Sequence, residues 1–165
     1  MKKVLLAILC LSIIACGAEE TKTKPSPTTQ NFVNSEDYTN LITIECKKLN
    51  NEIFALEQVR RIDPEDFKEN GESLTLLYSV YIDYYKTLKK ITPSEVEAKN
   101  HKIFYQNLNK ASEVALSYGK IYKKSDDAKN KALVKAKKKY QTFRDDVLFP
   151  SANKIDGCNL ELSEN

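Results

Sequence analysis

From Ser35 onward, apolar residues recur at intervals of three and four, and no stretch alternates as a half-buried strand does. This spacing predicts helices over about 35–61, 73–91, 93–122 and 126–149. Four amphipathic helices joined by short turns are typical of an all-α, up-down-up-down four-helix bundle. We therefore expect one such bundle with a flexible N-terminal tether and a C-terminal tail.

The predicted helix boundaries follow local signals. Ser35 is a suitable N-cap, and two acids follow it in the first turn. The Thr-Pro-Ser-Glu run at 92–95 matches a capping box with proline at the first helical position. Asn70-Gly71 predicts the end or a kink of a short helical turn, Ser125 a new helix start, and Pro150 a stop.

The inward face of each predicted helix is one line of apolar residues. Those lines are Tyr38, Ile42, Cys46, Leu49, Ile53 and Leu56; Leu74, Leu77, Tyr81, Tyr85, Leu88 and Ile91; Val96, Ile103, Leu108, Ala111, Ala115 and Tyr118; and Ala128, Ala132, Ala136, Tyr140, Phe143 and Val147. The three alanines of the last line, spaced by four, predict a close approach of a neighbouring helix.

The N-terminal segment has the order of an export signal. Lys2 and Lys3 precede an apolar run at 4–14 that is too short to span a bilayer, and Ile13-Ile14-Ala15-Cys16 closes it. This segment resembles the lipobox of bacterial lipoproteins, although Ile13 stands where leucine is commonest. The resemblance implies a signal peptide at 1–15, removed before Cys16, and a lipid (palmitate among its acyl chains) on Cys16. The residue after Cys16 is Gly17 and not the aspartate that resembles an inner-membrane retention signal. The resemblance therefore also implies the outer membrane, on the periplasmic or the surface side.

The mature chain divides into two parts. Residues 16–33 include a Thr, Lys, Pro and Ser-rich stretch without apolar periodicity, which predicts a flexible, lipid-anchored linker. Residues 34–165 form a single helical-bundle domain. Its length is sufficient for one hydrophobic core.

Two cysteines remain once the signal is removed and Cys16 carries lipid. An exported pair favours a disulfide between Cys46 and Cys158, and a tail running back along the first helix would bring them together. The alternative is two unpaired thiols, one buried and one in a loose tail.

Motifs for catalysis, metals and cofactors are missing from the sequence. The single histidine, His101, has Glu97 one turn away but lacks the partners of a di-iron site, so we interpret it as a helix-edge residue beside Phe104 and Leu108. Nucleophile elbows and Gly-rich phosphate loops are absent, and Met1 is the only methionine. We expect no catalytic residues, no metal and no cofactor.

Charge is unevenly distributed in a mature chain that is nearly neutral. Residues 120–139 contain nine lysines and two aspartates, whereas 36–72 contain ten acids and five bases. The possible anionic-ligand face consists of Lys124, Lys131, Lys135, Lys138 and Lys139. Three accounts stay open: a solvated face, pairing with Glu45, Glu52 or Glu57 of a neighbouring first helix, or binding of an anionic glycan or lipid head group.

These features predict a non-catalytic, membrane-anchored envelope lipoprotein that acts as a binding or scaffold module. Its expected partners are the membrane, through the N-terminal lipid, and another envelope protein or an anionic glycan. Nucleic acid is not expected, because the lysines lack arginines and exposed aromatics between them. Two alternatives are a surface-exposed lipoprotein that engages host or neighbouring-cell molecules, and an enzyme with an unrecognised carboxylate site.

Overall fold

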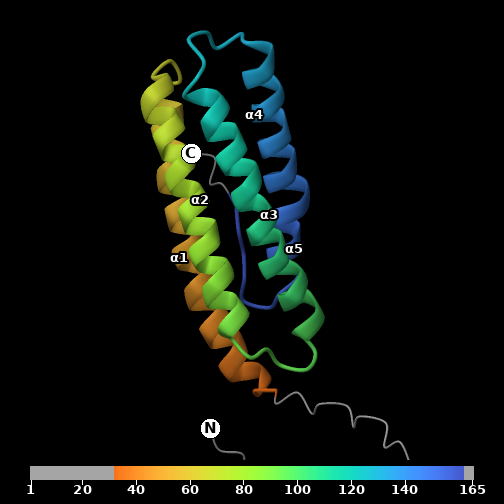
Figure 1. The fold of residues 1–165 in the computed structure, drawn as a ribbon. Helices are drawn as coiled ribbons and strands as arrows, with labels where there is room; N and C mark the ends of the chain where they lie inside the picture. Colours follow the sequence, from red (N-terminus) through yellow and green to blue (C-terminus); the bar gives the residue numbers. More distant parts are fainter. Residues whose placement is uncertain (1–31, 162–165) are drawn as a thin grey trace, which may run out of the picture. The chain divides into compact units, whose positions relative to one another are not determined.

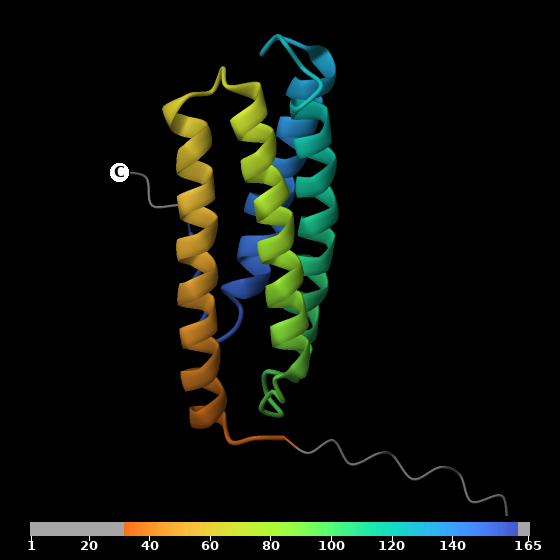
Figure 2. The same cartoon turned by 60° about the vertical axis from the view of Figure 1, so that its left-hand side comes forward.

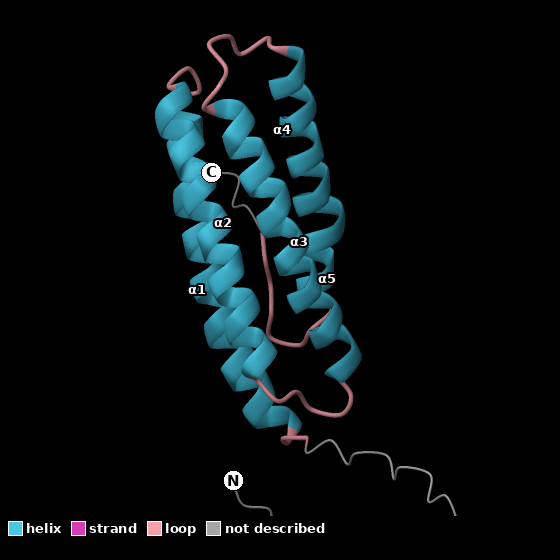
Figure 3. Ribbon diagram, in the orientation of Figure 1, coloured by secondary structure: helices cyan, strands magenta, loops and turns pink. Residues whose placement is uncertain are grey.

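The computed structural model describes residues 32–161, apart from the side chain of Arg61. The predicted signal peptide, Cys16 and all but the end of the predicted tether lie outside the described residues. Within them the chain is all-helical and contains no strand, as the periodicity predicts (Figure 3). Its elements are α1 (Ser35–Ile62), α2 (Phe67–Lys90), α3 (Ala98–Tyr122), α4 (Lys131–Phe143), the π-helical turn η1 (Arg144–Leu148) and α5 (Phe149–Ala152).

The long helices pack side by side as a helical bundle. α2 contacts both α1 and α3, and α3 in turn contacts α4, η1 and α5 (Figure 1). In the described part of the chain, α1 and α4 do not approach each other closely through their backbones. The expected pairing of the α4 lysines with acids of α1 is therefore not formed, whereas Arg144, which follows α4, does pair with Glu57 of α1.

The C-terminal tail lies along α1. Cys158 is bonded to Cys46, with 5.3 Å between their Cα atoms, so the predicted disulfide is confirmed. Farther along, the backbone amide of Glu161 donates to the side chain of Asn50, and Figure 2 shows the dark blue segment beside α1. Gly157 has a φ of +83°, and a side chain there would also press on Thr39, so glycine is required at this turn.

The core is built from the predicted lines on α1 and α2 with few changes. Tyr38, Ile42, Cys46, Leu49 and Ile53 are all buried, and Leu56 is half-buried. On α2, the buried apolar residues are Leu74, Leu77, Tyr81, Tyr84 and Leu88. For the predicted third helix the pattern was less reliable, because Val96, in the turn before α3, and Ile103, on α3, are exposed.

Two predicted boundaries around α2 and α3 were wrong. Asn70 and Gly71 lie inside α2, where Asn70 donates to the carbonyl of Asp63 and Gly71 packs closely against Gly119 of α3. A Cβ on Gly119 would lie 3.2 Å from the Gly71 carbonyl oxygen, so these glycines permit close helix packing instead of ending a helix. The Thr-Pro-Ser-Glu run at 92–95 does not cap α3, because a turn intervenes and the helix begins at Ala98.

α4 also begins later than predicted. Asn130 caps it by accepting from the amides of Ala132 and Leu133, whereas the Ser125 hydroxyl donates to the carbonyl of Ile121 at the end of α3. Ala128 therefore lies in the connection, and Ala132 is exposed. The predicted alanine contact with a neighbouring helix is not formed along most of its length.

The π-helical turn changes which residues face the core after α4. A π-turn inserts an additional residue and rotates the following side chains relative to an α-helical pattern. Leu148, Phe149 and Ala152 are buried, whereas the predicted core residue Val147 is exposed. Pro150 does not end the helical segment, because it lies in the first turn of α5, where its missing amide is tolerated.

Candidate functional site

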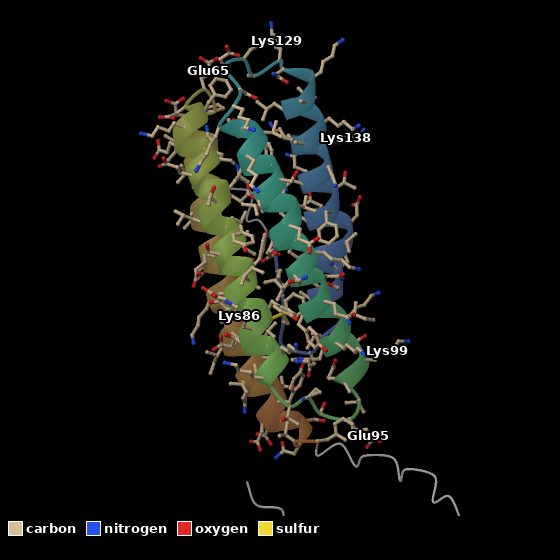
Figure 4. All side chains as sticks on the ribbon, in the orientation of Figure 1. Glu65, Lys86, Glu95, Lys99, Lys129 and Lys138 are labelled. Atoms are coloured by element: carbon tan, nitrogen blue, oxygen red, sulfur yellow. A yellow bond between two sulfur atoms is a disulfide. The ribbon has the colours of Figure 1, made fainter. Side chains whose placement is uncertain are left out.

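The cationic face consists of the five lysines named above, one in the α3–α4 connection and four on α4. All five side chains are exposed, and none forms an ion pair with any described residue. Lys131, Lys135 and Lys138 recur at helical spacing. Figure 4 shows the Lys138 side chain pointing away from α3.

The acids proposed as alternative partners of these lysines are engaged elsewhere. Glu45 pairs with Lys48 at 2.8 Å on α1, and Glu52 accepts from the Tyr84 hydroxyl at 3.1 Å. Glu57 pairs with two arginines. The pairing account is therefore wrong, and the cationic face is left to solvent or to a ligand.

A shallow groove of about 210 Å³ lies beside the cationic face, between α3 and α4. Val114, Ile121 and Ala136 contribute apolar surface, while Lys135 and Lys139 also line it. α4 is well suited to expose such a surface, because only Leu133 and Tyr140 of its thirteen residues are buried.

A buried ion-pair cluster was missed by the sequence analysis. It consists of Glu57 and Arg60 from α1, Tyr140 from α4, and Arg144 from η1. One Glu57 oxygen accepts from the Tyr140 hydroxyl at 2.7 Å and from Arg144 at 3.1 Å, and the other pairs with Arg60. The arginine side chains are 10% and 8% exposed, so the charges are largely removed from water.

The ionisation of Glu57 is fixed by its neighbours. Burial alone raises the pKa of its carboxyl, but the charges of Arg60 and Arg144 and the Tyr140 hydrogen bond outweigh burial and lower that pKa. Glu57 is therefore an anion at neutral pH. Both guanidinium groups also lie 5.6 Å from the centre of the Tyr140 ring, within cation–π range.

Arg144 is the first residue of the π-turn and bridges two carboxylates. Arg144 donates to both oxygens of Asp145, at 2.7 and 3.1 Å, while its remaining nitrogen reaches Glu57. One sequence signal could have indicated this role. The chain has only three arginines against 23 lysines, and arginine is favoured where buried carboxylates are bound in a fork.

His101 is a buried structural residue and not the predicted helix-edge residue. It is 2% exposed, its Nε2 lies 2.8 Å from the carbonyl oxygen of Leu88, and its Nδ1 lies 2.9 Å from the Tyr38 hydroxyl. Because a carbonyl only accepts, Nε2 carries the proton and Nδ1 accepts from Tyr38. Burial lowers the pKa of His101 although the Leu88 hydrogen bond and Glu97 raise it, so the neutral ring is favoured.

No group of three His, Cys, Asp or Glu side chains between residues 32 and 161 is placed to hold a metal ion. None of the helices in that range has both the length and the apolar composition of a membrane span. Comparison with protein-family models, curated proteins and solved structures finds no match to the chain.

Proposed function

We propose that this chain is a non-catalytic envelope lipoprotein whose helical domain binds anionic partners while lipid on Cys16 holds it at the membrane. The domain is an up-down-up-down four-helix bundle, linked to Cys16 by a flexible tether. The contacts of α1 with α2, α2 with α3 and α3 with α4 support this arrangement, because helices joined by short connections pack as antiparallel neighbours.

The cationic face supports the binding role, because its lysines form no ion pair with any described residue. Each lysine near an anionic surface contributes about 1 kcal/mol of attraction, so five exposed lysines form a useful electrostatic surface without a buried site. The apolar groove beside Lys135 and Lys139 adds contact area for the part of a ligand that follows its charged group. Anionic glycans and anionic lipid head groups have the required chemistry.

The test is charge reversal on α4. We expect the triple variant Lys131→Glu, Lys135→Glu, Lys138→Glu to lose binding to vesicles containing anionic lipid and to a sulfated glycan, measured by co-sedimentation and by titration. Wild-type binding should weaken steadily with salt, because exposed charges are screened within about 8 Å at physiological ionic strength.

A matched control carries the same change in charge elsewhere. Lys90, Lys99 and Lys102 are exposed on α2 and α3, and their reversal to glutamate should leave most of the binding intact. Equal losses in both triple variants would show that only net charge matters, and the cationic face would be rejected.

Anchoring is tested separately at Cys16. Cys16→Ser should abolish incorporation of labelled fatty acid and leave either an uncleaved precursor or a protein released from the membrane. A mature N-terminus found elsewhere by mass spectrometry, without lipid, would contradict the anchoring.

A further inference from the structure

A polar cavity of about 150 Å³ adjoins the buried ion-pair cluster. It lies among α1, α3, α4 and η1, and the cationic face is not part of its lining. Its lining residues are Glu57, Arg60, Pro64, Tyr118, Tyr122, Lys137, Tyr140, Gln141 and Arg144. The volume equals that of an engineered cavity that holds benzene, so the space fits a small molecule or the terminal group of a larger one.

The charges around this cavity do not balance. Glu57 is the only acid in the lining, and both of its oxygens are already paired. Arg144 is held between Glu57 and Asp145. Two arginines and two carboxylates thus neutralise one another. Lys137, which is exposed and forms no ion pair with any described residue, adds a positive charge at the edge of the cavity.

Hydrogen-bond donors are also left over. Arg60 pairs with Glu57 through Nη2, whereas its Nη1 is buried and has no hydrogen-bond partner among the described residues. A buried, unpaired donor on a charged group is costly, and in native proteins such a group usually has a bound water or ion as its partner. The Tyr118 hydroxyl makes no hydrogen bond within the described chain, and the Tyr122 hydroxyl donates to the Pro64 carbonyl.

We propose that this cavity binds a small oxyanion, namely the carboxylate or phosphate group of a small molecule. Lys137 supplies an exposed charge without an ion-pair partner among the described residues, the Arg60 guanidinium adds positive charge in the wall, and Tyr118 and Gln141 supply neutral donors. Water already solvates the exposed ammonium of Lys137, whereas an oxyanion would add a charge-assisted contact with it and accept hydrogen bonds from the neutral donors.

The aromatic rings in the lining affect which kind of oxyanion the cavity would favour. The rings of Tyr118 and Tyr140 lie 5.7 Å apart and both line the cavity. A flat, singly charged carboxylate such as benzoate offers an apolar face to these rings, while inorganic phosphate offers more acceptors to the donors. The two ligands therefore test which source of the oxyanion the cavity favours.

The experiment titrates the mature, disulfide-bonded protein with inorganic phosphate, benzoate and the cationic isostere benzamidine. Binding is followed by calorimetry and by amide chemical shifts. We expect at least one oxyanion to bind with a Kd of about 1 mM or tighter, which is within the affinity that so few atoms can supply. The largest shifts should fall at Tyr118 and Gln141, and benzamidine should not compete.

Two variants on α4 make the test specific. Lys137→Gln should weaken oxyanion binding about tenfold, because a charge-assisted contact is lost. Lys138→Gln removes the same charge one position away, outside the cavity lining, and should change the Kd less than about twofold. Tyr118→Phe should weaken binding without altering the sulfated-glycan affinity of the cationic face.

Three results would overturn the proposal: no saturable shift with either oxyanion up to about 20 mM, equal binding of benzamidine, or equal effects of Lys137→Gln and Lys138→Gln. The triple reversal on the cationic face leaves Lys137 in place, so failure of that surface and failure of this cavity are distinguished.

Discussion

α1 and α4 differ in how they are attached to the pair formed by α2 and α3. Each contacts one long helix through its backbone, α1 with α2 and α4 with α3. α1 is also joined to α3 by the Tyr38–His101 hydrogen bond, to the C-terminal tail by the disulfide, and to η1 by the Glu57–Arg144 ion pair. α4 buries only Leu133 and Tyr140. Similar amphipathic sequences therefore produce one helix held from several sides and one helix with most of its surface free.

The largest expected loss on the α1 side is that of the disulfide. Replacing Cys46 and Cys158 together by alanine should lower the free energy of unfolding by about 4 kcal/mol, because the bond closes a loop with a sequence separation of 112. Urea denaturation measures the change. Reduction of the wild type should produce a similar loss and should not affect the variant, and a loss below about 1 kcal/mol would mean that the tail contributes little to holding α1.

Glu57→Gln should have the next largest effect, about 3 kcal/mol, because it leaves Arg60 and Arg144 buried without their shared anion. The matched control is Glu52→Gln on the same helix, where the carboxylate is exposed and accepts only from Tyr84. Its expected cost is below about 1 kcal/mol. Equal costs at the two positions would show that the cluster does not hold α1 more firmly than a surface contact does.

The burial of His101 beside Tyr38 should make stability depend on pH, because burial lowers the pKa of the imidazole. The folded-state pKa of His101 lies below its ordinary value of 6.5, so the unfolded chain takes up the proton first. Stability is fully present above pH 6.5 and should fall as the pH drops from there toward the folded-state pKa, by at most about 1.4 kcal/mol per pH unit.

His101→Gln should flatten this part of the profile, because glutamine retains a donor and an acceptor without titrating in the range. Urea unfolding at several pH values checks the slope. Glu57 contributes a separate loss at lower pH, since its lowered pKa places its protonation below about 4.5. A slope between pH 6.5 and 5 that persists in His101→Gln would assign the dependence to another group.

The smallest effect is expected on the free surface of α4. Lys131→Ala, Lys135→Ala and Lys138→Ala should each change the free energy of unfolding by less than about 0.5 kcal/mol, because these side chains are exposed and unpaired in the described structure. Thermal unfolding measures this. A loss above about 1 kcal/mol at any of the three would indicate that α4 is held by that lysine and that its outer surface is structural.

The sequence predicted α1 well and α4 poorly for physical reasons. α1 repeats one apolar spacing over 28 residues, so a single face is unambiguous. The predicted cap was wrong by one residue, because Asn34 and not Ser35 accepts from the amide of Asp37. At α4, two capping signals lie five residues apart, Ser125 and Asn130, and the second is used. The π-turn begins at Arg144 and changes which residues face the core, and the α-helical period does not encode it.

The ion-pair cluster could not be predicted from the local sequence either. Tyr140 and Glu57 are 83 residues apart, and an isolated glutamate among surface acids looks like a solvated one. The cysteine pair, separated even further, was predictable because only two cysteines remained to be joined. Chemical rarity was therefore the better guide to long-range contacts.

The covalent path through the domain has a consequence for proteolysis. Cys46 and Cys158 close a ring that contains α2, α3 and α4 with all of their connections, including the exposed residues 126–130 between α3 and α4. One cut anywhere in that ring opens it but releases no fragment, because both pieces remain joined through sulfur. Under the proposed anchoring at Cys16, a clipped domain would stay attached to its membrane as a single covalent unit until the disulfide is reduced.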